Sequence, residues 1–336
     1  MIRICISRID KMGDMILTLP VIKSIKTNNP NSVIHVLASK TNEKILKNIK
    51  YIDKTILINS DHSILKNLIE LRKIKYDYFI NFSPRKKSYF FCFFSNSHNK
   101  AIIIFLSRYK RTYLSKFLLK FFSKIFCSTQ LIVDRYEKLN KNQDIHQTKM
   151  MFDLVKKCKI KHDTNVLIDI DLPKRKLNFS QKKVVVLHLS EKWINKNYSE
   201  KNFIDLILSL FDKNFSVLMT TDNTTRNIFK KIFVKYKVIS ERDIENIKIL
   251  KNQALIIDNL KYFSWLKVIY SSSFVITPEC GCSHIAAACK VPVNIIYGPY
   301  NLPDAIQKEY SPWKSNYNKF IFGENNLNSK LISNIN

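Results

Sequence analysis

A segment near the carboxyl end of the chain carries residues suited to binding an anion. Residues 277–288, TPECGCSHIAAA, run from an apolar strand through a turn into an Ala-rich helix. Gly281 is one of only four glycines, and without a side chain it leaves the amides of Cys280 to Cys282 accessible. Backbone N–H groups at a helix start attract anions such as phosphate. His284, one turn further, could add a hydrogen-bond donor.

Two other interpretations of this segment stay open on the residues alone. The turn could be an ordinary helix start, with His284 buried in the core. Cys280, Cys282 and His284 could also ligate a metal ion, although three ligands within five residues are closer together than in known zinc sites. The segment therefore indicates an anion site without excluding a structural role.

A second segment, KMGDMILTLP at residues 11–20, follows the first strand of the chain. Gly13 would permit a tight turn, and the carboxylate of Asp14 could face a binding cleft and accept a proton. Asp is also a common helix N-cap residue. Asp14 is therefore a candidate base or a candidate cap.

Strands and helices alternate along the chain with short connections, which predicts parallel sheets covered on both faces. Expected strands include Ile2 to Ile6, Val33–Leu37, Thr55–Ile58 and Tyr78–Asn81, and a second series that begins at Val184. A helix should begin or kink near Pro20. We expect an α/β protein with two doubly wound, Rossmann-like domains, residues 1–175 and 182–336, joined by a polar linker within 160–182 and facing a cleft.

Composition narrows the class of protein. The chain has 336 residues, of which 46% are hydrophobic, so it is not disordered. Its formal net charge is +29. Compositional bias could account for part of this charge, but in either case it attracts nucleic acid, anionic lipid or acidic substrates. The seven cysteines are scattered, which favours reduced thiols in the cytoplasm. We expect neither a signal peptide nor a transmembrane segment, because the apolar runs are short and interrupted.

Residues 84–135 form the most basic and aromatic region, with 11 Lys and Arg, 12 aromatic residues and one acid, Asp134. Within it, Leu114, Phe117, Leu118, Phe121, Phe122 and Ile125 share one face of an expected helix, whereas Lys116, Lys120 and Lys124 share another. The helix either docks on its own domain with a solvated lysine edge or contacts an anionic membrane.

The order and separation of the two motifs resemble glycosyltransferase family 9, the ADP-heptose:lipopolysaccharide heptosyltransferases and their relatives. The likeness covers roughly residues 1–83 and 183–303, whereas 84–180 match only in general layout. It implies a GT-B fold, an acceptor-binding first domain and a second domain that binds the nucleotide sugar. No cofactor is implied, because the nucleotide sugar, ADP-heptose, is a substrate.

The resemblance also assigns roles to single residues. Asp14 matches the catalytic base of an inverting displacement. Lys196 matches the lysine of a K-x-W-P motif that neutralises the nucleotide phosphates, and Thr221 and Asp222 are weaker candidates for donor contacts. The remaining expected donor contacts are Glu279, Cys280, Gly281, Cys282 and His284.

Several residues depart from the family pattern. Glu279 replaces the usual Asp, Tyr198-Ser199 replaces Trp-Pro, and Ser190-Glu191 replace a Gly-containing loop. These departures leave the donor sugar open. Asp169-Ile170-Asp171 has the form of a D-x-D metal motif, but it falls in the expected linker. We therefore expect solvated linker charge there and no metal.

The sequence therefore predicts an inverting, metal-independent enzyme that moves a heptose, or a related sugar, from an ADP-sugar to an anionic lipopolysaccharide or lipooligosaccharide core. We expect it at the inner face of the cytoplasmic membrane, as a peripheral protein. A catalytically silent glycolipid-binding relative and a charge-driven nucleic-acid-binding protein are the alternatives.

Overall fold

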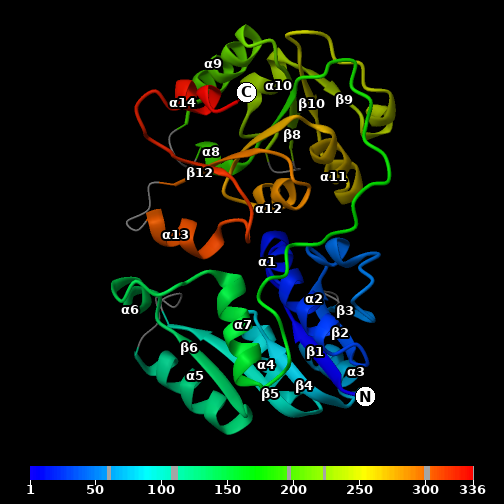
Figure 1. Ribbon diagram of the computed structural model, residues 1–336, viewed down its shortest axis with the longest axis vertical. Coiled ribbons are helices and arrows are strands. Elements are labelled where there is room, and N and C mark those ends of the chain that lie inside the picture. Colours follow the sequence, from blue (N-terminus) through cyan, green and yellow to red (C-terminus); the bar gives the residue numbers. More distant parts are fainter. Residues whose placement is uncertain (59–61, 107–112, 195–197, 222–224, 299–302, 336) are drawn as a thin grey trace. The chain divides into compact units, whose positions relative to one another are not determined.

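The chain folds into two α/β units, each built on one parallel sheet (Figure 1). The computed structural model describes residues 1–58, 62–106, 113–194, 198–221, 225–298 and 303–335. Unit 1 is Met1–Asp171 and unit 2 is Leu172–Asn336. The division falls within the expected linker, 160–182, which has no helix or strand but is not free of the units. Ser24 Oγ donates to the carbonyl of Asp163, and Ile170 is buried.

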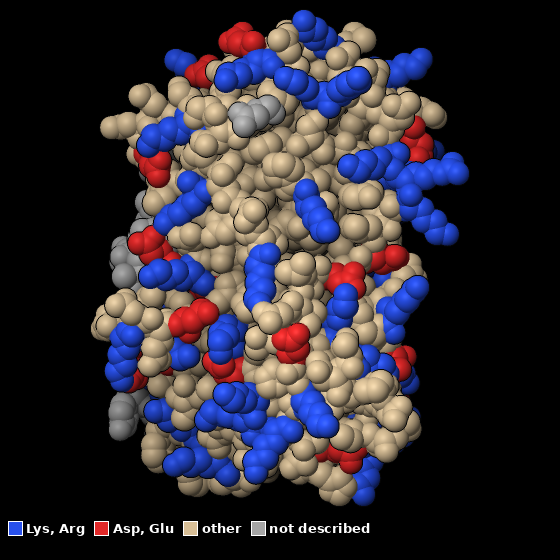
Figure 2. All heavy atoms as spheres, in the orientation of Figure 1, with Lys and Arg blue, Asp and Glu red and all other residues tan. Residues whose placement is uncertain are grey.

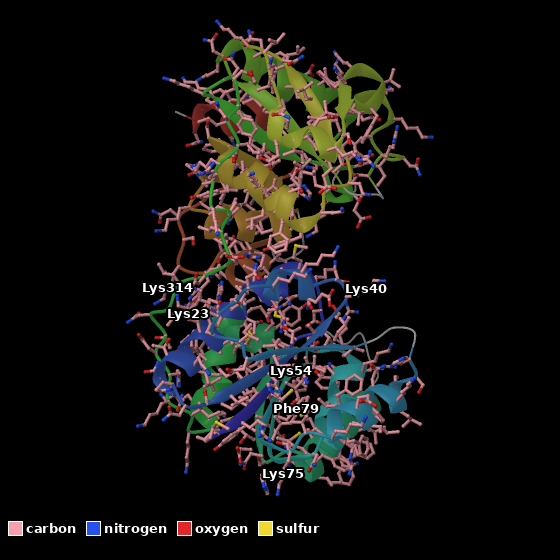
Figure 3. The ribbon with its side chains drawn as sticks, turned by 90° about the vertical axis from the view of Figure 1, so that its right-hand side faces the viewer. Lys23, Lys40, Lys54, Lys75, Phe79 and Lys314 are labelled. Carbon is pink, nitrogen blue, oxygen red and sulfur yellow. The ribbon has the colours of Figure 1, made fainter. Side chains whose placement is uncertain are left out.

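Six parallel strands form the sheet of unit 1 in the order β3-β2-β1-β4-β5-β6. They are β1 (Arg3–Ser7), β2 (Val33–Ser39), β3 (Lys54–Ile58), β4 (Tyr76–Asn81), β5 (Ser97–Phe105) and β6 (Thr129–Val133). This is the order of a doubly wound sheet, whose switch point, where successive strands begin to add on the other side, lies between β1 and β4. In Figure 3, Lys75 and Lys40 mark opposite edges of the sheet, and Lys40 follows β2 at the carboxyl edge.

Helices cover both faces of this sheet. They are α1 (Met12–Ile16), α2 (Leu19–Asn28), η1 (Glu43–Leu46), α3 (Ile64–Arg72), α4 (Lys86–Phe94), α5 (Tyr113–Phe126), α6 (Arg135–Asn140) and α7 (Gln147–Lys157). Apolar residues of α3, α4 and α5 pack on one face, around Phe79 and Ile102, while α2 and α7 lie side by side on the other (Figure 1). This arrangement confirms the predicted doubly wound architecture.

The segment after β1 differs from the sequence-based expectation. We expected a loop with a tight turn at Gly13, but residues 12–16 form α1, so Gly13 has helical backbone. A second helix, α2, begins at Leu19 and places Pro20 at its second position. Proline is tolerated there because the first amides of a helix have no intrahelical partner. The predicted helix start near Pro20 is confirmed.

Unit 2 has seven parallel strands in the order β13-β12-β11-β7-β8-β10-β9. They are β7 (Val184–His188), β8 (Ser216–Thr220), β9 (Lys237–Ile239), β10 (Ala254–Ile257), β11 (Phe274–Pro278), β12 (Val293–Tyr297) and β13 (Asn318–Ile321). The first strand, β7, lies beside β11, and the switch point of the sheet is between them. It occupies the same topological position as β1/β4 in unit 1.

The helices of unit 2 are α8 (Glu191–Ile194), α9 (Glu200–Asp212), α10 (Lys230–Lys235), η3 (Glu241–Asn246), α11 (Tyr262–Ser271), α12 (Gly281–Ala288), α13 (Pro303–Tyr310) and α14 (Leu327–Ser333). Trp193 is fully buried and packs against Tyr198, Phe203 and Phe322. This aromatic cluster anchors the chain directly after β7 and so positions the residues at the switch point.

Candidate active site

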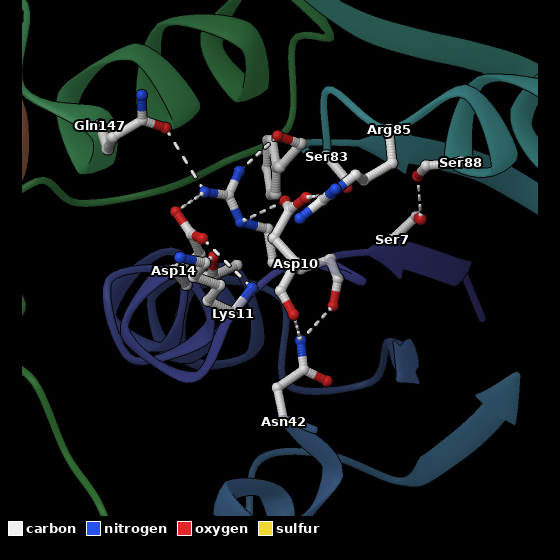
Figure 4. A network of polar contacts seen from close by, with 12 residues as sticks. Ser7, Asp10, Lys11, Asp14, Asn42, Ser83, Arg85, Ser88 and Gln147 are labelled. Atoms are coloured by element: carbon white, nitrogen blue, oxygen red, sulfur yellow. Dashed lines mark hydrogen bonds and ion pairs between the residues drawn. The ribbon is translucent and has the colours of Figure 1, made fainter. Parts of the chain in front are cut away.

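The switch point of unit 1 holds a buried network of charged side chains (Figure 4). Arg8 directly follows β1, and its side chain is completely buried. Its Nη2 atom lies 2.7 Å from Asp14 Oδ1, and its Nε atom lies 3.4 Å from Asp10 Oδ2. Arg85, which follows β4, places its own Nε 3.2 Å from Asp10 Oδ1. Two cations therefore balance two carboxylates at the end of the two central strands.

Further contacts hold Arg8 in place. Its Nη1 donates to the backbone carbonyl of Phe82, and its Nη2 lies 3.5 Å from Gln147 Oε1. Asn42 donates from Nδ2 to the carbonyl of Arg8 at 2.9 Å. These partners come from the segments that follow β2 and β4 and from α7, so tertiary structure alone determines the orientation of the guanidinium.

Asp14 is the carboxylate of this network that reaches solvent, since 17% of its side chain is exposed against 5% for Asp10. Arg8 holds Oδ1, and the backbone N–H of Lys11 donates to Oδ2 at 3.2 Å. Lys11 occupies the N-cap position, so Asp14 is the third residue of α1 and not its N-cap residue. Asp14 is therefore the N3 residue of a capping box and not the predicted N-cap residue, and its carboxylate is oriented at the carboxyl edge of the sheet.

A pocket of about 600 Å³ lies at the same edge of unit 1. Its walls come from the segments that follow the four strands β1 to β4, and they combine cations with a few apolar and hydroxyl groups: Ile9, Ser39, Lys40, Thr41, Ile58, Pro84, Arg85, Lys86 and Lys87. Among the residues that the structure describes, none that lines the pocket is acidic. Such a lining suits an anionic ligand with polar hydroxyls.

In unit 2, the turn between β11 and α12 stands at the switch point, as the sequence predicted for 277–288. Glu279 is held by Lys192 of α8, whose Nζ lies 2.6 Å from Oε2 and also donates to the Glu279 carbonyl. Ser283 donates from Oγ to the Cys280 carbonyl at 2.7 Å. The turn is therefore fixed from both sides, with Gly281 as the first residue of α12.

The electrostatics of the turn favour negative charge. Burial raises the pKa of the Cys280 thiol, but a hydrogen bond with His188 and the charges of His188 and Lys192 outweigh it, so the pKa is lower than usual. Thr277 Oγ1 also lies 3.3 Å from Cys280 Sγ. Cys282 is different, because burial and its neighbour Cys280 raise the pKa of its thiol far above the ordinary value. The environment that favours negative charge is therefore found at Cys280, the N-cap residue of α12, and does not extend to the thiol of Cys282.

The other predicted donor residues are placed as follows. His284 is buried in the second turn of α12. Thr221 follows β8, and its Oγ1 lies 2.5 Å from Asp258 Oδ1. Lys196 and Asp222 lie outside the residues that the structure describes. Unit 2 thus brings Glu279 to Cys282 and His284 together in one turn and helix.

Lys116, Lys120 and Lys124 belong to unit 1, on α5. Lys116 and Lys120 are half-buried, whereas Lys124 is exposed. They lie on one side of the helix, as predicted, and they take no part in the network around Arg8.

Sequence analysis missed the cations of the pocket as well as Asp10 and Arg85 of the network. It also missed three residues next to the first strands, Arg8, Lys192 and His188. Each stands within four residues of the end of a first strand, β1 or β7, where doubly wound sheets place ligand contacts. Their position at the end of a first strand was the feature of the sequence that could have identified them. It was weak for Arg8 and Lys192, because the chain has 56 basic residues and nothing local distinguishes these two.

The D-x-D segment packs on unit 1. Asp169 Oδ2 lies 2.5 Å from Lys23 Nζ, and Tyr51 donates to the Asp169 carbonyl. Asp171 accepts from Asn48. We expected solvated linker charge, and the contacts show a docked segment instead. Across the described ranges, no three His, Cys, Asp or Glu side chains are grouped so as to hold a metal ion.

Two doubly wound units, each with a polar site at its switch point, define a protein of the GT-B class, and solved structures support this. The chain is similar to a family 9 glycosyltransferase from Veillonella parvula DSM 2008, with a TM-score of 0.72 and 14% identity over 95% of this chain and 85% of that one. It is similar to E. coli heptosyltransferase WaaC with ADP (TM-score 0.68, 15% identity, 95% and 93% covered). It is also similar to E. coli ADP-heptose lps heptosyltransferase II (TM-score 0.69, 14% identity, 96% and 90% covered).

The chain belongs to glycosyltransferase family 9 (heptosyltransferase), whose family model matches residues 64–334. The match includes 84–180, where we expected only a general likeness. It begins after the Lys11–Pro20 segment, so Asp14 lies outside it. No curated protein matches the sequence.

Proposed function

We propose that this protein transfers a heptose, or a closely related sugar, from an ADP-sugar to an anionic lipopolysaccharide or lipooligosaccharide core, with inversion at the anomeric carbon. The observation that carries the proposal is the pair of switch-point sites. Unit 1 orients a carboxylate, Asp14, beside a cationic pocket, and unit 2 presents an anion-favouring helix start. Membership of family 9 supports this choice.

Asp14 acts as the base in this proposal. The acceptor hydroxyl loses its proton to the carboxylate as its oxygen attacks the anomeric carbon, and the bond from that carbon to the ADP oxygen breaks. Arg8 and the Lys11 amide hold both carboxylate oxygens before the substrate arrives, so little orientational freedom remains to be lost.

The turn at the start of α12 receives the donor. The WaaC structures contain ADP and ADP-2-deoxy-2-fluoro heptose, which supports an adenine nucleotide sugar here. The field that favours thiolate at Cys280 would also stabilise the diphosphate as negative charge develops on it. Glu279 repels phosphate but suits sugar hydroxyls, and Lys192 offsets its charge. Lys196 and His284 complete the proposed phosphate contacts, and the reaction uses no metal or cofactor.

The pocket of unit 1 receives the acceptor. Lys40, Arg85, Lys86 and Lys87 would bind carboxylate or phosphate groups on the core saccharide. Since such an acceptor is lipid-linked, we place the enzyme at the cytoplasmic face of the inner membrane. Among the described residues, no helix is long and apolar enough to cross a bilayer.

Titration calorimetry and a transfer assay test the proposal together. We expect ADP and ADP-heptose to bind in preference to UDP and GDP sugars. Asp14→Asn should keep that affinity and lose about 10²- to 10⁴-fold in kcat, the usual contribution of a general base. Asp169→Asn, a carboxylate in the same unit, is the matched control and should leave kcat unchanged.

Each alternative has its own outcome. ADP-sugar binding without transfer by the unaltered protein would indicate a silent relative. Absence of any nucleotide binding, together with salt-sensitive retention of DNA or RNA, would indicate a charge-driven nucleic-acid-binding protein. Preference for another nucleotide would overturn the proposed donor.

A further inference from the structure

Helix α5 attaches to unit 1 through one narrow side. Leu119 and Phe126 pack on the apolar core beneath it, and Ser123 between them is completely buried. At about 100° per residue, these three positions lie within roughly 60° of one another around the helix axis. Most of the helix circumference therefore faces away from the domain.

The outward part of α5 is apolar. Five large side chains are each 41–59% exposed: Phe117, Leu118, Phe121, Phe122 and Ile125. They span an arc of roughly 140° around the axis, and we call them the α5 arc. An ordinary surface helix buries its apolar stripe, so this helix shows the reverse arrangement.

The α5 arc is continuous with exposed aromatic surface on α4. The rings of Phe117 and Phe121 stack at 6.2 Å, and Phe122 stacks on Phe126 at 6.3 Å. Phe126 in turn contacts Phe94 of α4 at 5.4 Å, and Phe94 is itself 38% exposed. The two helices thus share one aromatic patch.

Positive charge borders the arc. Lys116, Lys120 and Lys124 line the margin of α5 next to Phe117, and residues 84–133 contain no Asp or Glu. Basic side chains are also abundant over the face of the protein shown in Figure 2. An apolar face bordered by lysines is typical of helices that lie in the interface of anionic membranes.

We propose that the α5 arc inserts into the boundary between head groups and acyl chains of an anionic bilayer, with Lys116, Lys120 and Lys124 at the head groups. This deepens the proposed function, on which it rests for the lipid-linked acceptor. It also changes the expected mode of contact, because the lysines were predicted to be the contact and the structure turns five apolar side chains outward beside them.

Charge favours a bilayer over a second copy of the chain as the occupant. A two-fold contact places the same patch on both partners, so the lysine margins and the basic surroundings would be brought together. Anionic lipid instead complements them, at about a five-fold gain in affinity for each basic residue near the surface.

Vesicle flotation of the full chain tests the insertion. The probe is a vesicle of phosphatidylethanolamine and phosphatidylglycerol, with a phosphatidylcholine vesicle as the neutral reference. Phe117→Ser/Phe121→Ser/Ile125→Ser should reduce partitioning at least 10-fold, at low salt and also at about 1 M salt, where the Debye length is about 3 Å. The control is Leu208→Ser/Val234→Ser/Leu250→Ser, three exposed apolar residues of unit 2, which should partition like the unaltered protein.

Substitutions of the three lysines test the electrostatic part of the membrane contact. Lys116→Gln/Lys120→Gln/Lys124→Gln should weaken partitioning at low salt by roughly 100-fold and have little effect at about 1 M salt. Replacing all three by Glu should abolish binding to anionic vesicles while nucleotide affinity survives. Equal partitioning of the serine variant and the unaltered protein would overturn the insertion, because contact would then be electrostatic only.

A second variant does not depend on loss of binding. The indole of Phe121→Trp should shift to shorter emission wavelength with anionic vesicles and be quenched by brominated acyl chains. An unquenched indole, or a lipid-free dimer that the serine variant dissociates, would overturn the proposal. Transfer to a deacylated, water-soluble acceptor should be unaffected by the serine variant, so failure of the arc is distinguishable from failure of the proposed function.

Discussion

Each of the two parallel sheets has an ion pair at its switch point, but the two ion pairs are buried to different extents. In unit 1, the cation is an arginine with no exposed surface and several partners from separate elements. In unit 2, it is a lysine that keeps 32% of its side chain exposed and contacts the carboxylate and the carbonyl of Glu279. A buried guanidinium imposes one geometry, whereas a solvated ammonium can exchange partners.

The difference suits the two proposed roles. A base must be oriented before the substrate arrives, and Arg8 orients Asp14 without requiring a ligand. A donor site must take up a diphosphate and later release ADP, and the accessible pair of Lys192 and Glu279 can rearrange around it. The same fold position therefore provides a rigid site in one unit and an adjustable site in the other.

Of the two cations, Arg8 should contribute more to the stability of its unit than Lys192 does. Arg8→Met leaves Asp10 and Asp14 without their buried partner, and we expect unit 1 to lose about 3–5 kcal/mol of stability. Urea unfolding followed by far-UV circular dichroism measures this loss. All three tryptophans, Trp193, Trp265 and Trp313, lie in unit 2, so their fluorescence follows the other unit and should change little.

Arg85→Met is the matched control for Arg8. Arg85 also pairs with Asp10, but 61% of its side chain is exposed, so its loss should cost less than about 1 kcal/mol. Equal destabilisation by the two substitutions would show that burial does not distinguish them.

Lys192→Met should have a smaller effect on stability and a visible effect on binding. This pair is only partly buried, so it should contribute less to folding than the pairs of the fully buried Arg8. ADP affinity should fall by up to roughly 10-fold, because the unpaired Glu279 carboxylate would repel the diphosphate. Calorimetry on Lys192→Met, Glu279→Gln and the double variant measures the coupling.

The double variant should bind ADP more tightly than Lys192→Met, because the repelling charge is gone. Lys201→Met, which removes an exposed lysine of α9, serves as the control for net charge. A double variant whose change in ADP affinity equals the sum of the two single changes would exclude coupling between Lys192 and Glu279.

Cysteine reactivity should give the smallest and most local effect. An ordinary thiol has a pKa of about 8.5. Because the pKa of Cys280 is lowered, its thiolate forms at a lower pH than that of an ordinary thiol. Alkylation by iodoacetamide should therefore be several-fold faster at Cys280 than at Cys282, whose pKa is raised, and should decline at a lower pH than alkylation of an ordinary thiol. Peptide mass spectrometry over a pH series measures both rates.

A substitution at His188 and the addition of ADP test the cause of the difference in cysteine reactivity. His188→Ala should move the Cys280 profile to higher pH, because it removes the strongest group that lowers the pKa. ADP should protect Cys280 if the start of α12 receives the diphosphate. Alkylation of Cys282 at the rate of Cys280 would contradict the electrostatic difference within the turn.

Local sequence patterns predicted much of the architecture. Alternating apolar residues located β1 and β2, and the apolar run at Val184 located β7. These strands are buried on both faces, so their composition alone identifies them. Local patterns did not predict β5 and β6, because the aromatic and basic residues around them suggested a different kind of region. They also did not predict α1, because this helix has only five residues and one of them is a glycine.

Some features of the candidate sites could likewise be predicted from local sequence, and others could not. Gly281 in an Ala-rich helix start and Asp14 after the first strand are visible locally, and both lie at switch points. The outward orientation of the α5 arc could not be predicted, because a periodic pattern shows that a helix has two faces without showing which one the domain covers.

By itself, the sequence determined the alternation of strands and helices, the two motifs and their order, since these depend on side-chain periodicity and on local backbone requirements. Tertiary structure alone decided which charges meet. Arg8 reaches Asp14, Phe82 and Gln147, the last 139 residues away in the chain, and Lys192 reaches Glu279 across 87 residues. Such pairs form because parallel strands end at one edge of a sheet, and the order of the strands brings distant residues together there.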